Sequence, residues 1–387
     1  MRKNKVKNKK SNSKNQIQKK KLRILMLNYE FPPLGGGASP VSYEIAKGYV
    51  KLGHSVDVVT MSYKDLPFDE VKDGINIYRV KCLRSKKEIC HPWEQLTYII
   101  SAKRFLKEHM KTHSYDINHT HFIIPTGIVA LWLKKKYNLP YIITSHGSDV
   151  LGYNNKRIFK YIYPLVKKQW KEVIKEAKYV TTPSQFLQNK IKEITEEGNF
   201  IVINNGIDLE KFKPMKKEKR ILVVARLFEN KGVQDILDAL KPLSEELKQK
   251  DWKVDIVGEG PYRAFLEKKA KKNNLQDLVI FHGWVDNGSK EMKELYGKAS
   301  IFISASWFEN MSIVLLEALA SGCEVIATNV GGNPEVIINK ENLFEAEDIK
   351  KLSEKIVYAI KNKNKINKLD NKFRWKNIIR EYEEVLR

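Results

Sequence analysis

Residues 308–322 read Phe308-Glu-Asn-Met-Ser-Ile-Val-Leu-Leu-Glu-Ala-Leu-Ala-Ser-Gly322. The apolar run from 313 to 320 predicts a helix, and Glu317 lies inside it with almost no polar neighbours. Because an unpaired buried carboxylate loses its hydration, we expect Glu317 either to face a solvent-filled cleft or to have a dedicated polar partner. A surface helix that carries two incidental glutamates is the alternative.

The start of this helix has features of a site for an anionic ligand. Ser312 is a residue type that caps helix N-termini, which places Glu309 in the loop just before the helix. The free amide groups at a helix N-terminus attract anions. Acidic side chains on either side of such a terminus suit a ligand that has both hydroxyl and phosphate groups.

Polar clusters also come directly after several short apolar runs that are rich in β-branched residues. Such runs are typical of buried strands in a parallel sheet. Ligands of open α/β sheets bind beyond the carboxyl ends of the strands, so the sequence predicts a site built from several strand ends. The runs, each with its polar cluster, are 23–27 before Gly35–Gly37, 141–144 before His146–Asp149, 221–225 before Arg226 and Lys231, 254–257 before Gly258–Gly260, and 300–304 before Glu309.

Strand and helix signals alternate along the chain, which predicts an α/β architecture with parallel sheets. A segment containing Gly, Pro and a run of charges divides this alternating pattern in two and is typical of a linker. The expected organisation is a basic disordered tail over 1–21, a Rossmann-like domain over 22–204, a linker over 205–219, a second Rossmann-like domain over 220–365, and a terminal helix within 366–387.

Composition excludes several classes of protein. A chain of 387 residues with 42% hydrophobic content is globular and long enough for two cores. The longest apolar stretch, near 123–133, is far shorter than the ~20 residues that a membrane-spanning helix needs. The N-terminus has no apolar signal segment, and the three cysteines show no metal-ligand spacing, so we expect a reducing cytoplasm.

The net charge of +24 is unevenly distributed. Residues 1–21 carry ten Lys or Arg and no acidic residue, and residues 156–178 carry eight basic residues with aromatics that include Tyr161 and Trp170. This mixture suits an interfacial helix on anionic lipid, with Tyr161 and Trp170 inserting shallowly. A solvated helix face is the alternative for 156–178, and compositional bias is the alternative for the tail.

The glycine turn Gly35–Gly37 lies between the first predicted strand and the first helix. Glycine there lets a phosphate or sugar approach the backbone closely, and an ordinary flexible turn is the alternative. The chain lacks Gly-x-Gly-x-x-Gly here and at 258–263, which argues against a dinucleotide-dependent enzyme.

Three polar side chains at strand ends are candidates for ligand contacts. Arg226 and Lys231 offer a planar fork and a point charge, and together they would stabilise a diphosphate leaving group. His146 would bond a sugar hydroxyl or move a proton. A pair of surface charges and a turn-capping histidine are the alternatives. No Asp-x-Asp pair is present to hold a metal–nucleotide complex, and we read the histidine pairs 109/113 and 119/121 as non-metal.

Short motifs occur one after another in a fixed order over residues 22–340. They are Gly35–Gly37 with Gly53-His54-x-Val56, Ser145–Asp149, Asn205–Asp208, Ala225–Gly232, Gly258–Pro261, Phe281–Val285, Glu309 with Glu317, and Gly331–Glu335. Taken together they resemble a family-four retaining glycosyltransferase of the GT-B fold. The resemblance implies two Rossmann-like, doubly wound parallel-sheet domains that face a cleft, an acceptor domain first and a nucleotide-sugar donor domain second. The last helix, around Trp375, would pack back across the cleft.

The resemblance implies metal-independent transfer of a hexose-type sugar from a nucleotide diphosphate to a saccharide or lipid-linked acceptor in cell-envelope glycan synthesis. The nucleotide-sugar is then a substrate, and no cofactor and no nucleic acid are expected. The enzyme would work in the cytoplasm, with peripheral attachment to the inner face of the membrane left open. A nucleotide-sugar epimerase or hydrolase of the same fold, a nucleic-acid-binding protein and an inactive scaffold are the alternatives.

Roles for single residues are also implied by the resemblance. The diphosphate would meet Arg226, Lys231 and the amides around Met311, Ser312 and Ile313, and Gly36 and Gly37 would approach it from the first domain. Glu309 and His146 would contact the transferred sugar, Glu317 the ribose hydroxyls, and Trp284 and Val285 the nucleobase. Asn310-Met311 replaces the more usual glycine and aromatic residue, which we expect to alter the choice of donor sugar.

Overall fold

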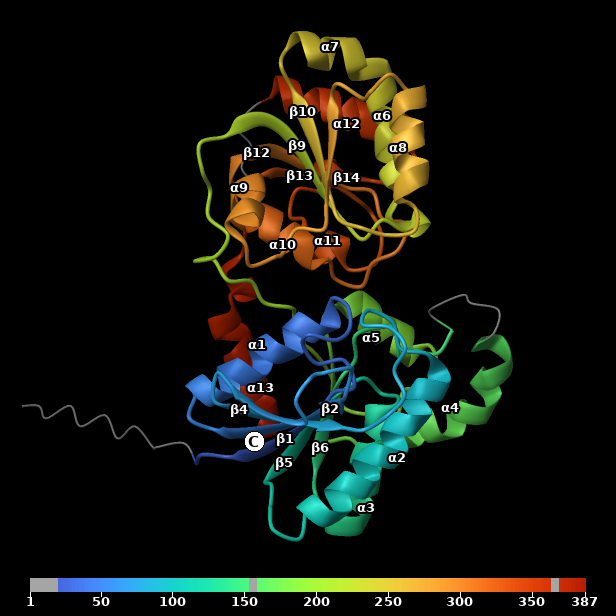
Figure 1. Ribbon diagram of the computed structural model, residues 1–387, viewed down its shortest axis with the longest axis vertical. Coiled ribbons are helices and arrows are strands. Elements are labelled where there is room, and N and C mark those ends of the chain that lie inside the picture. Colours follow the sequence, from blue (N-terminus) through green and yellow to red (C-terminus); the bar gives the residue numbers. More distant parts are fainter. Residues whose placement is uncertain (1–19, 153–158, 363–368) are drawn as a thin grey trace, which may run out of the picture.

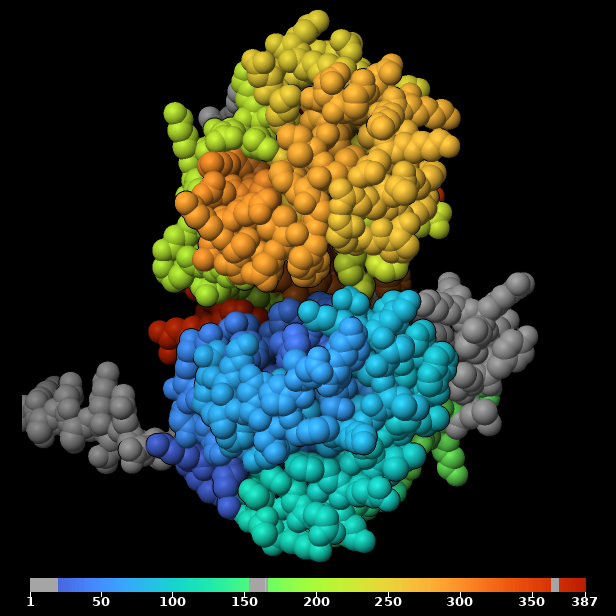
Figure 2. Space-filling model, viewed as in Figure 1, coloured from blue at the N-terminus to red at the C-terminus, as the bar shows by residue number. Residues whose placement is uncertain are grey.

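The computed structural model describes residues 20–152, 159–362 and 369–387, without the side chains of 159–163 and 165. Two α/β domains are stacked along the long axis of the molecule (Figure 1). They meet at a waist that is visible in the space-filling view (Figure 2). The basic tail predicted for 1–21 lies almost entirely outside the described residues.

The first domain contains an eight-stranded sheet in the order β3-β4-β2-β1-β5-β6-β7-β8, in which only β3 is antiparallel to its neighbour. The strands are β1 Arg23–Leu27, β2 Ser55–Met61, β3 Asp69–Lys72, β4 Ile75–Val80, β5 Ile117–His121, β6 Tyr141–Thr144, β7 Tyr179–Thr182 and β8 Phe200–Val202. The helices are α1 Ala38–Lys51, α2 Pro92–His109, α3 Thr126–Tyr137, α4 Phe159–Lys175 and α5 Gln185–Lys192.

The second domain contains a six-stranded sheet in the order β11-β10-β9-β12-β13-β14, with every pair parallel. The strands are β9 Glu218–Val224, β10 Lys253–Val257, β11 Val279–Gly283, β12 Ala299–Ser304, β13 Glu324–Thr328 and β14 Leu343–Phe344. The helices are α6 Val233–Leu240, α7 Ser244–Gln249, α8 Arg263–Lys272, α9 Lys290–Lys298, α10 Ile313–Ala320, α11 Asn333–Val336 and α12 Ile349–Lys361.

Both sheets are buried on both faces, as the continuous apolar runs predict. In β1, Leu25 and Leu27 pack into one core cluster, whereas Ile24 and Met26 pack into another on the opposite face. The strand β9 divides its side chains between two clusters in the same way. Such strands need helices on each side of the sheet, so the predicted class of doubly wound α/β domains is confirmed.

The strand order reverses beside the first strand of each domain, and this reversal fixes where a ligand is expected to bind. The strand β1 lies between β2 and β5, and β9 lies between β10 and β12. At such a switch point the connecting loops diverge to opposite faces of the sheet and leave room at the carboxyl ends of the strands.

The last helix, α13 (Trp375–Leu386), returns from the second domain and packs on the first (Figure 1). Its side chains Ile378 and Tyr382 belong to the core cluster around α1 and β1. A side chain at Gly48 in α1 would collide with Ile379, so glycine allows the two helices their close approach. The chain therefore crosses between the domains, and its last helix contributes to the core of the first one.

The hypothesis that Trp170 inserts into lipid is wrong. Trp170 is fully buried in the core of the first domain, and its indole Nε1 donates a hydrogen bond to the Asp149 carbonyl at 2.9 Å. An indole held in this way is part of the core and is not available to a membrane. The side chain of Tyr161 lies outside the described part of the structure. Within that part, no helix is both long enough and apolar enough to span a bilayer.

Candidate functional site

Two charged side chains from neighbouring strand ends form the centre of the candidate site. Lys231 lies on a short 3-10 turn (Glu229–Lys231) after β9, and Glu309 lies in the loop after β12. The Lys231 Nζ donates to Glu309 Oε1 at 2.6 Å, and both side chains are largely buried. The next residue, Gly232, has φ +64° and lies directly against the Ala305 carbonyl, so only glycine allows these two loops to pack together.

Arg226 brings a second cation toward the glycine turn of the first domain. It is exposed, and its guanidinium lies 5.4 Å from the ring centre of Phe228. A methyl group at Gly36 would lie 3.7 Å from the Arg226 Nη1, whereas Gly37 faces open space. An anion that binds here would meet Arg226 from one domain and the glycine turn from the other.

The N-terminus of α10 differs in one detail from the prediction. Ser312 occupies the N-cap position and is buried, but its side chain makes no capping hydrogen bond. Ile313 begins the helix, and Met311 is buried beside it. The Met311 Sδ accepts from the Asn205 backbone N–H at 3.3 Å, so the loop is held by the interdomain linker and not by a serine cap.

Asn310 links the two domains. Its side-chain amide donates to the His146 carbonyl, and its atoms fill the space where a side chain at Gly147 would lie. The residue that departs from the family pattern therefore contacts the first domain directly. Its expected influence on the choice of donor sugar stays a prediction.

Glu317 has dedicated polar partners, which was one of the two expectations for it. The carboxylate is almost fully buried and accepts hydrogen bonds from Asn287 Nδ2 at 2.9 Å and from the Tyr296 hydroxyl at 2.7 Å. Burial raises the pKa of Glu317, and these two hydrogen bonds partly offset that shift. Sequence reasoning missed both partners.

Trp284 and Val285 occupy the loop after β11. Like Lys231 and Glu309, they lie beyond the carboxyl ends of the parallel strands. The Trp284 side chain is 72% exposed, whereas Val285 is buried in a core cluster of the second domain. Asn287 from this loop reaches Glu317, so the exposed indole lies on the segment that positions the buried carboxylate.

His146 lies two residues after the end of β6 and contacts His121 of β5. Its Nε2 is 3.0 Å from the His121 Nδ1, and the two rings stack with centroids 5.3 Å apart. Burial lowers the pKa of His146 to about 3, which leaves the ring neutral at pH 7. Of the two roles predicted for it, this geometry favours a hydrogen bond to a sugar hydroxyl over proton transfer.

Three neighbouring histidines, of which His119 and His121 are fully buried and His146 is partly buried, make folding sensitive to acid. Burial lowers the pKa of His119 to about 3, and the pKa values of His121 and His146 are also lowered. Below pH 6.5 these histidines bind protons in the unfolded chain but stay neutral in the folded chain. The free energy of unfolding therefore falls as the pH falls toward 3.

We expect His119→Gln to reduce this loss by about 1.4 kcal/mol per pH unit between about pH 6 and pH 4, since one titrating group is removed. Gln can keep polar contacts with Tyr49 and Thr144, which bond the ring at 3.0 and 2.8 Å. Urea unfolding at several pH values measures the slope, and His113→Gln, at an exposed position, controls for the loss of one histidine. Identical slopes for wild type and His119→Gln would contradict the prediction.

Glu335 makes an interdomain contact that sequence reasoning did not assign. Its two carboxylate oxygens accept from the backbone N–H groups of Gln185 at 2.8 Å and Phe186 at 2.9 Å, at the first turn of α5. A carboxylate at a helix N-terminus satisfies free amide donors and interacts favourably with the helix dipole. Glu335 and Asn310 thus join the loops of the second domain to the first.

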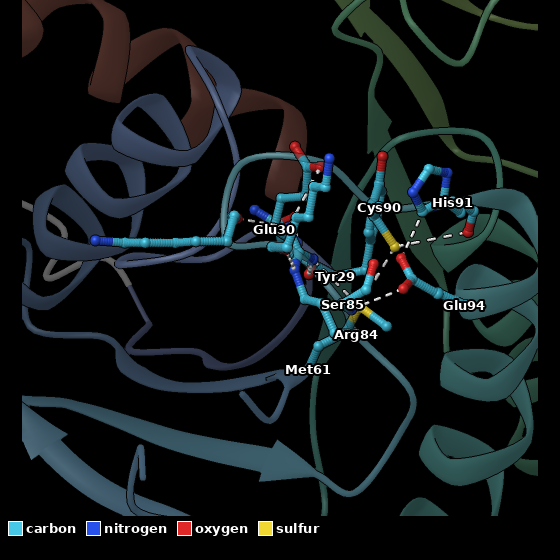
Figure 3. Close-up of polar contacts among 11 residues, drawn as sticks. Tyr29, Glu30, Met61, Arg84, Ser85, Cys90, His91 and Glu94 are labelled. Atoms are coloured by element: carbon cyan, nitrogen blue, oxygen red, sulfur yellow. Dashed lines mark hydrogen bonds and ion pairs between the residues drawn. The ribbon is translucent and has the colours of Figure 1, made fainter. Parts of the chain in front are cut away.

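A buried arginine, Arg84, holds the loop that contacts the glycine turn, and Figure 3 shows it beside Tyr29 and Glu30. Arg84 donates to the backbone carbonyls of Tyr29, Lys86 and Lys87, and its guanidinium lies 3.8 Å from the Glu30 carboxylate. Burial raises the pKa of Glu30, and the charge of Arg84 partly opposes the shift. In the loop that Arg84 holds, the Lys87 carbonyl accepts a hydrogen bond from the Gly35 N–H at 2.9 Å.

Among the described residues, no group of three or more His, Cys, Asp or Glu side chains is arranged to bind a metal ion. Arg226 and Lys231 place two positive charges beside the candidate site. Side-chain cations and free backbone amides of this kind suit an anionic ligand.

Comparison with known families divides the chain at the same point as the two sheets. The model for "Glycosyltransferase Family 4" matches residues 35–211, and the model for "Glycosyl transferases group 1" matches residues 206–375. Between them they cover residues 35–375, which include the strands and helices of the first domain that follow β1, the second domain and the start of the crossing helix.

Individual relatives agree with these matches. An uncharacterized glycosyltransferase of Methanocaldococcus jannaschii is 29% identical over 353 residues, covering 83% of this chain and 84% of that protein. An alpha-monoglucosyldiacylglycerol synthase of Streptococcus pneumoniae is also 29% identical, covering 79% of this chain and 69% of that protein. The crystal structure of HepE from Anabaena, in complex with UDP and glucose, superimposes with a TM-score of 0.72 at 18% identity, covering 94% of this chain and 99% of that one.

The two family models match in the order of the two domains, and the solved structure shares the arrangement of both sheets. This protein is a glycosyltransferase with the GT-B fold and belongs to the family-four type.

Proposed function

We propose that this enzyme transfers a hexose-type sugar from a nucleoside diphosphate donor to a saccharide or lipid-linked acceptor, with retention of the anomeric configuration, in cell-envelope glycan synthesis. The ion pair between Lys231 and Glu309 carries the proposal, because it joins a cation for phosphate to a carboxylate for sugar hydroxyls at 2.6 Å. The UDP and glucose bound to HepE and the glycolipid in the name of the pneumococcal relative support the two substrate classes.

The geometry supports a mechanism in which the protein positions the reactants and stabilises charge. Arg226 and Lys231 would neutralise the diphosphate as its bond to the sugar breaks, and the acceptor oxygen would attack from the same face of the sugar. The acceptor's proton would pass to the leaving diphosphate. Glu309, already held by Lys231, would accept hydrogen bonds from the donor sugar.

Where the enzyme works in the cell forms part of the proposal. We place it in the cytoplasm, where nucleotide-sugars serve as donors, with peripheral attachment to the inner face of the membrane. The ten basic residues of 1–21 supply a long-range attraction of about 1 kcal/mol at most for each Lys or Arg near an anionic surface.

A donor screen in a chelating buffer tests the proposed function. The full-length protein is incubated in EDTA with a panel of nucleoside diphosphate hexoses, with soluble saccharides or lipid-linked acceptors, and nucleotide release and product configuration are measured. We expect acceptor-dependent release, a product with the donor's anomeric configuration, and no requirement for metal, because two cations already face the diphosphate position.

Each part of the proposal fails on a different result of this screen. Activity that is lost in EDTA and restored by Mn²⁺ or Mg²⁺ refutes metal independence. Release at the same rate without any acceptor indicates the epimerase or hydrolase alternative. An inverted product refutes retention but leaves sugar transfer standing.

A further inference from the structure

Five large apolar side chains are exposed close together on the first domain. They come from α2 and from the loop that precedes it (Figure 1). Burying apolar area is the main favourable term in association, so a cluster of this kind marks an interaction surface. We call this surface the α2 face, and its members with their exposed fractions are Leu83 64%, Ile89 40%, Trp93 58%, Leu96 61% and Ile100 67%.

Helical spacing places the α2 members on one stripe. Trp93, Leu96 and Ile100 are separated by three and four residues and so lie on one side of the helix. Tyr98 and Leu106, on the opposite side, are fully buried in the core. The core therefore accounts for only one of the two apolar sides of α2.

Basic residues border the α2 face. The same side of α2 continues with exposed Arg104 and Lys107, and the preceding loop adds exposed Lys81, Lys86 and Lys87. An apolar stripe with a basic border is the pattern by which helices lie in the surface of an anionic membrane, with apolar groups at the acyl boundary and cations at the headgroups.

The acidic residues nearby do not cancel this charge. Glu94 is buried and caps the start of α2 by accepting the His91 N–H at 2.7 Å. Glu108 is paired with Lys111 at the far end of the helix. Glu88 is the exposed acid in the loop. The net positive border also disfavours a second copy of this chain as the occupant, because two such borders would repel each other.

The α2 face is attached to the site through a rigid loop. Glu94 also accepts the Ser85 N–H at 2.7 Å, and Arg84 holds the carbonyls of Lys87 and Tyr29 (Figure 3). Lys87 in turn accepts the Gly35 N–H of the glycine turn. In the space-filling view the light blue to cyan surface around residues 80–100 lies just below the waist between the domains (Figure 2).

We infer that the α2 face docks this enzyme on an anionic membrane surface, with the glycine turn and the facing Arg226 held next to the lipid headgroups. A lipid-linked acceptor would then reach the site from the bilayer without leaving it. This second step rests on the proposed function, whereas docking itself does not. The α2 face takes the place of the segment around Trp170, whose indole belongs to the core.

Vesicle binding by the full-length protein tests the inference. Co-sedimentation with phosphatidylglycerol–phosphatidylcholine vesicles is compared for wild type, Leu96→Ser/Ile100→Ser, and the matched control Phe265→Ser/Ile280→Ser, which removes two exposed apolar side chains from the second domain. We expect the α2 variant to bind at least about tenfold more weakly than wild type, and the control to bind like wild type.

Salt separates the α2 face from the basic tail. Deleting residues 1–20 removes screened, long-range attraction, so its effect should disappear at about 0.5 M salt, whereas the effect of Leu96→Ser/Ile100→Ser should persist. Thermal unfolding of each variant shows that it is folded. Equal losses for the α2 variant and its control, or undiminished binding of the α2 variant, overturn the inference.

Two further readouts complete the test. If wild type binds pure phosphatidylcholine as strongly as anionic vesicles, the basic border has no role in docking. If sedimentation velocity shows a wild-type dimer that the α2 variant abolishes, the face is an interface between copies of the chain, and the inference is wrong. Transfer to a soluble acceptor should be unchanged in the α2 variant. If wild type transfers to no acceptor at all, the proposed function fails, while vesicle binding still decides the docking surface.

Discussion

Replacing Lys231 with alanine is expected to lower kcat/KM on the order of 10²-fold or more. Lys231 supplies a preorganised positive charge where the diphosphate would leave, and such groups typically contribute this much to the rate. The substitution also removes the 2.6 Å partner of Glu309, whose charge is then left largely buried without that compensation. Arg226→Ala, which removes the other cation, is expected to cost a similar factor.

Because Lys231 and Glu309 touch, we expect their effects to be non-additive. Glu309→Gln alone should mainly lower kcat, and Lys231→Ala/Glu309→Gln should cost little more than the worse of the two single changes. Steady-state kinetics on the four proteins of this cycle measure the coupling, with Lys271→Ala, at an exposed position on α8, as the control. Losses that multiply would show that the two residues act independently.

The sequence predicts this part of the site because of how parallel sheets are built. The apolar runs before Arg226 and Glu309 become β9 and β12, which are direct neighbours, so the residues after them meet at one edge. Local periodicity identifies such strands, and the rule for carboxyl ends converts strand order into proximity. The glycine turn after β1 is found by the same reasoning.

Contacts between residues far apart in the chain were not predictable in this way. Asn287 and Tyr296 lie 30 and 21 residues from Glu317, and nothing in their local sequence identifies them as its partners. Glu335 reaches α5 across 150 residues. These pairings depend on how loops and domains pack, which local patterns do not encode.

The sequence alone also does not show which aromatic residues of the amphipathic helices are buried. Trp170 has basic neighbours in sequence, but the tertiary structure turns its side of α4 toward the core. In α2 the apolar residues occupy two sides of the helix, and the sequence alone does not show which side faces solvent. The exposed side became visible only when Tyr98 and Leu106 were seen to fill the core.

Glu317→Gln is expected to change the pH dependence of stability and to weaken nucleotide binding. Burial raises the pKa of Glu317, so on a rise in pH the unfolded chain releases this proton before the folded chain does. The free energy of unfolding of the wild type therefore falls as the pH rises from about 4.5 to the folded pKa, and glutamine, which does not titrate, escapes this loss. The stability of the variant relative to wild type should increase with pH across that window.

Nucleotide binding should weaken, because the ribose hydroxyls lose a charged acceptor. We expect Glu317→Gln to weaken binding of the free nucleoside diphosphate by about 1–3 kcal/mol, whereas Glu309→Gln, which acts on the sugar, should leave it nearly unchanged. Urea unfolding at pH 5 and pH 8 and calorimetry with UDP, ADP, GDP and CDP measure the two effects. Equal losses of nucleotide affinity in both variants would refute the separate roles of the two carboxylates. A Glu317→Gln protein that binds nucleotide like wild type would mean that the carboxylate serves Asn287 and Tyr296 alone, as a structural group of the second domain.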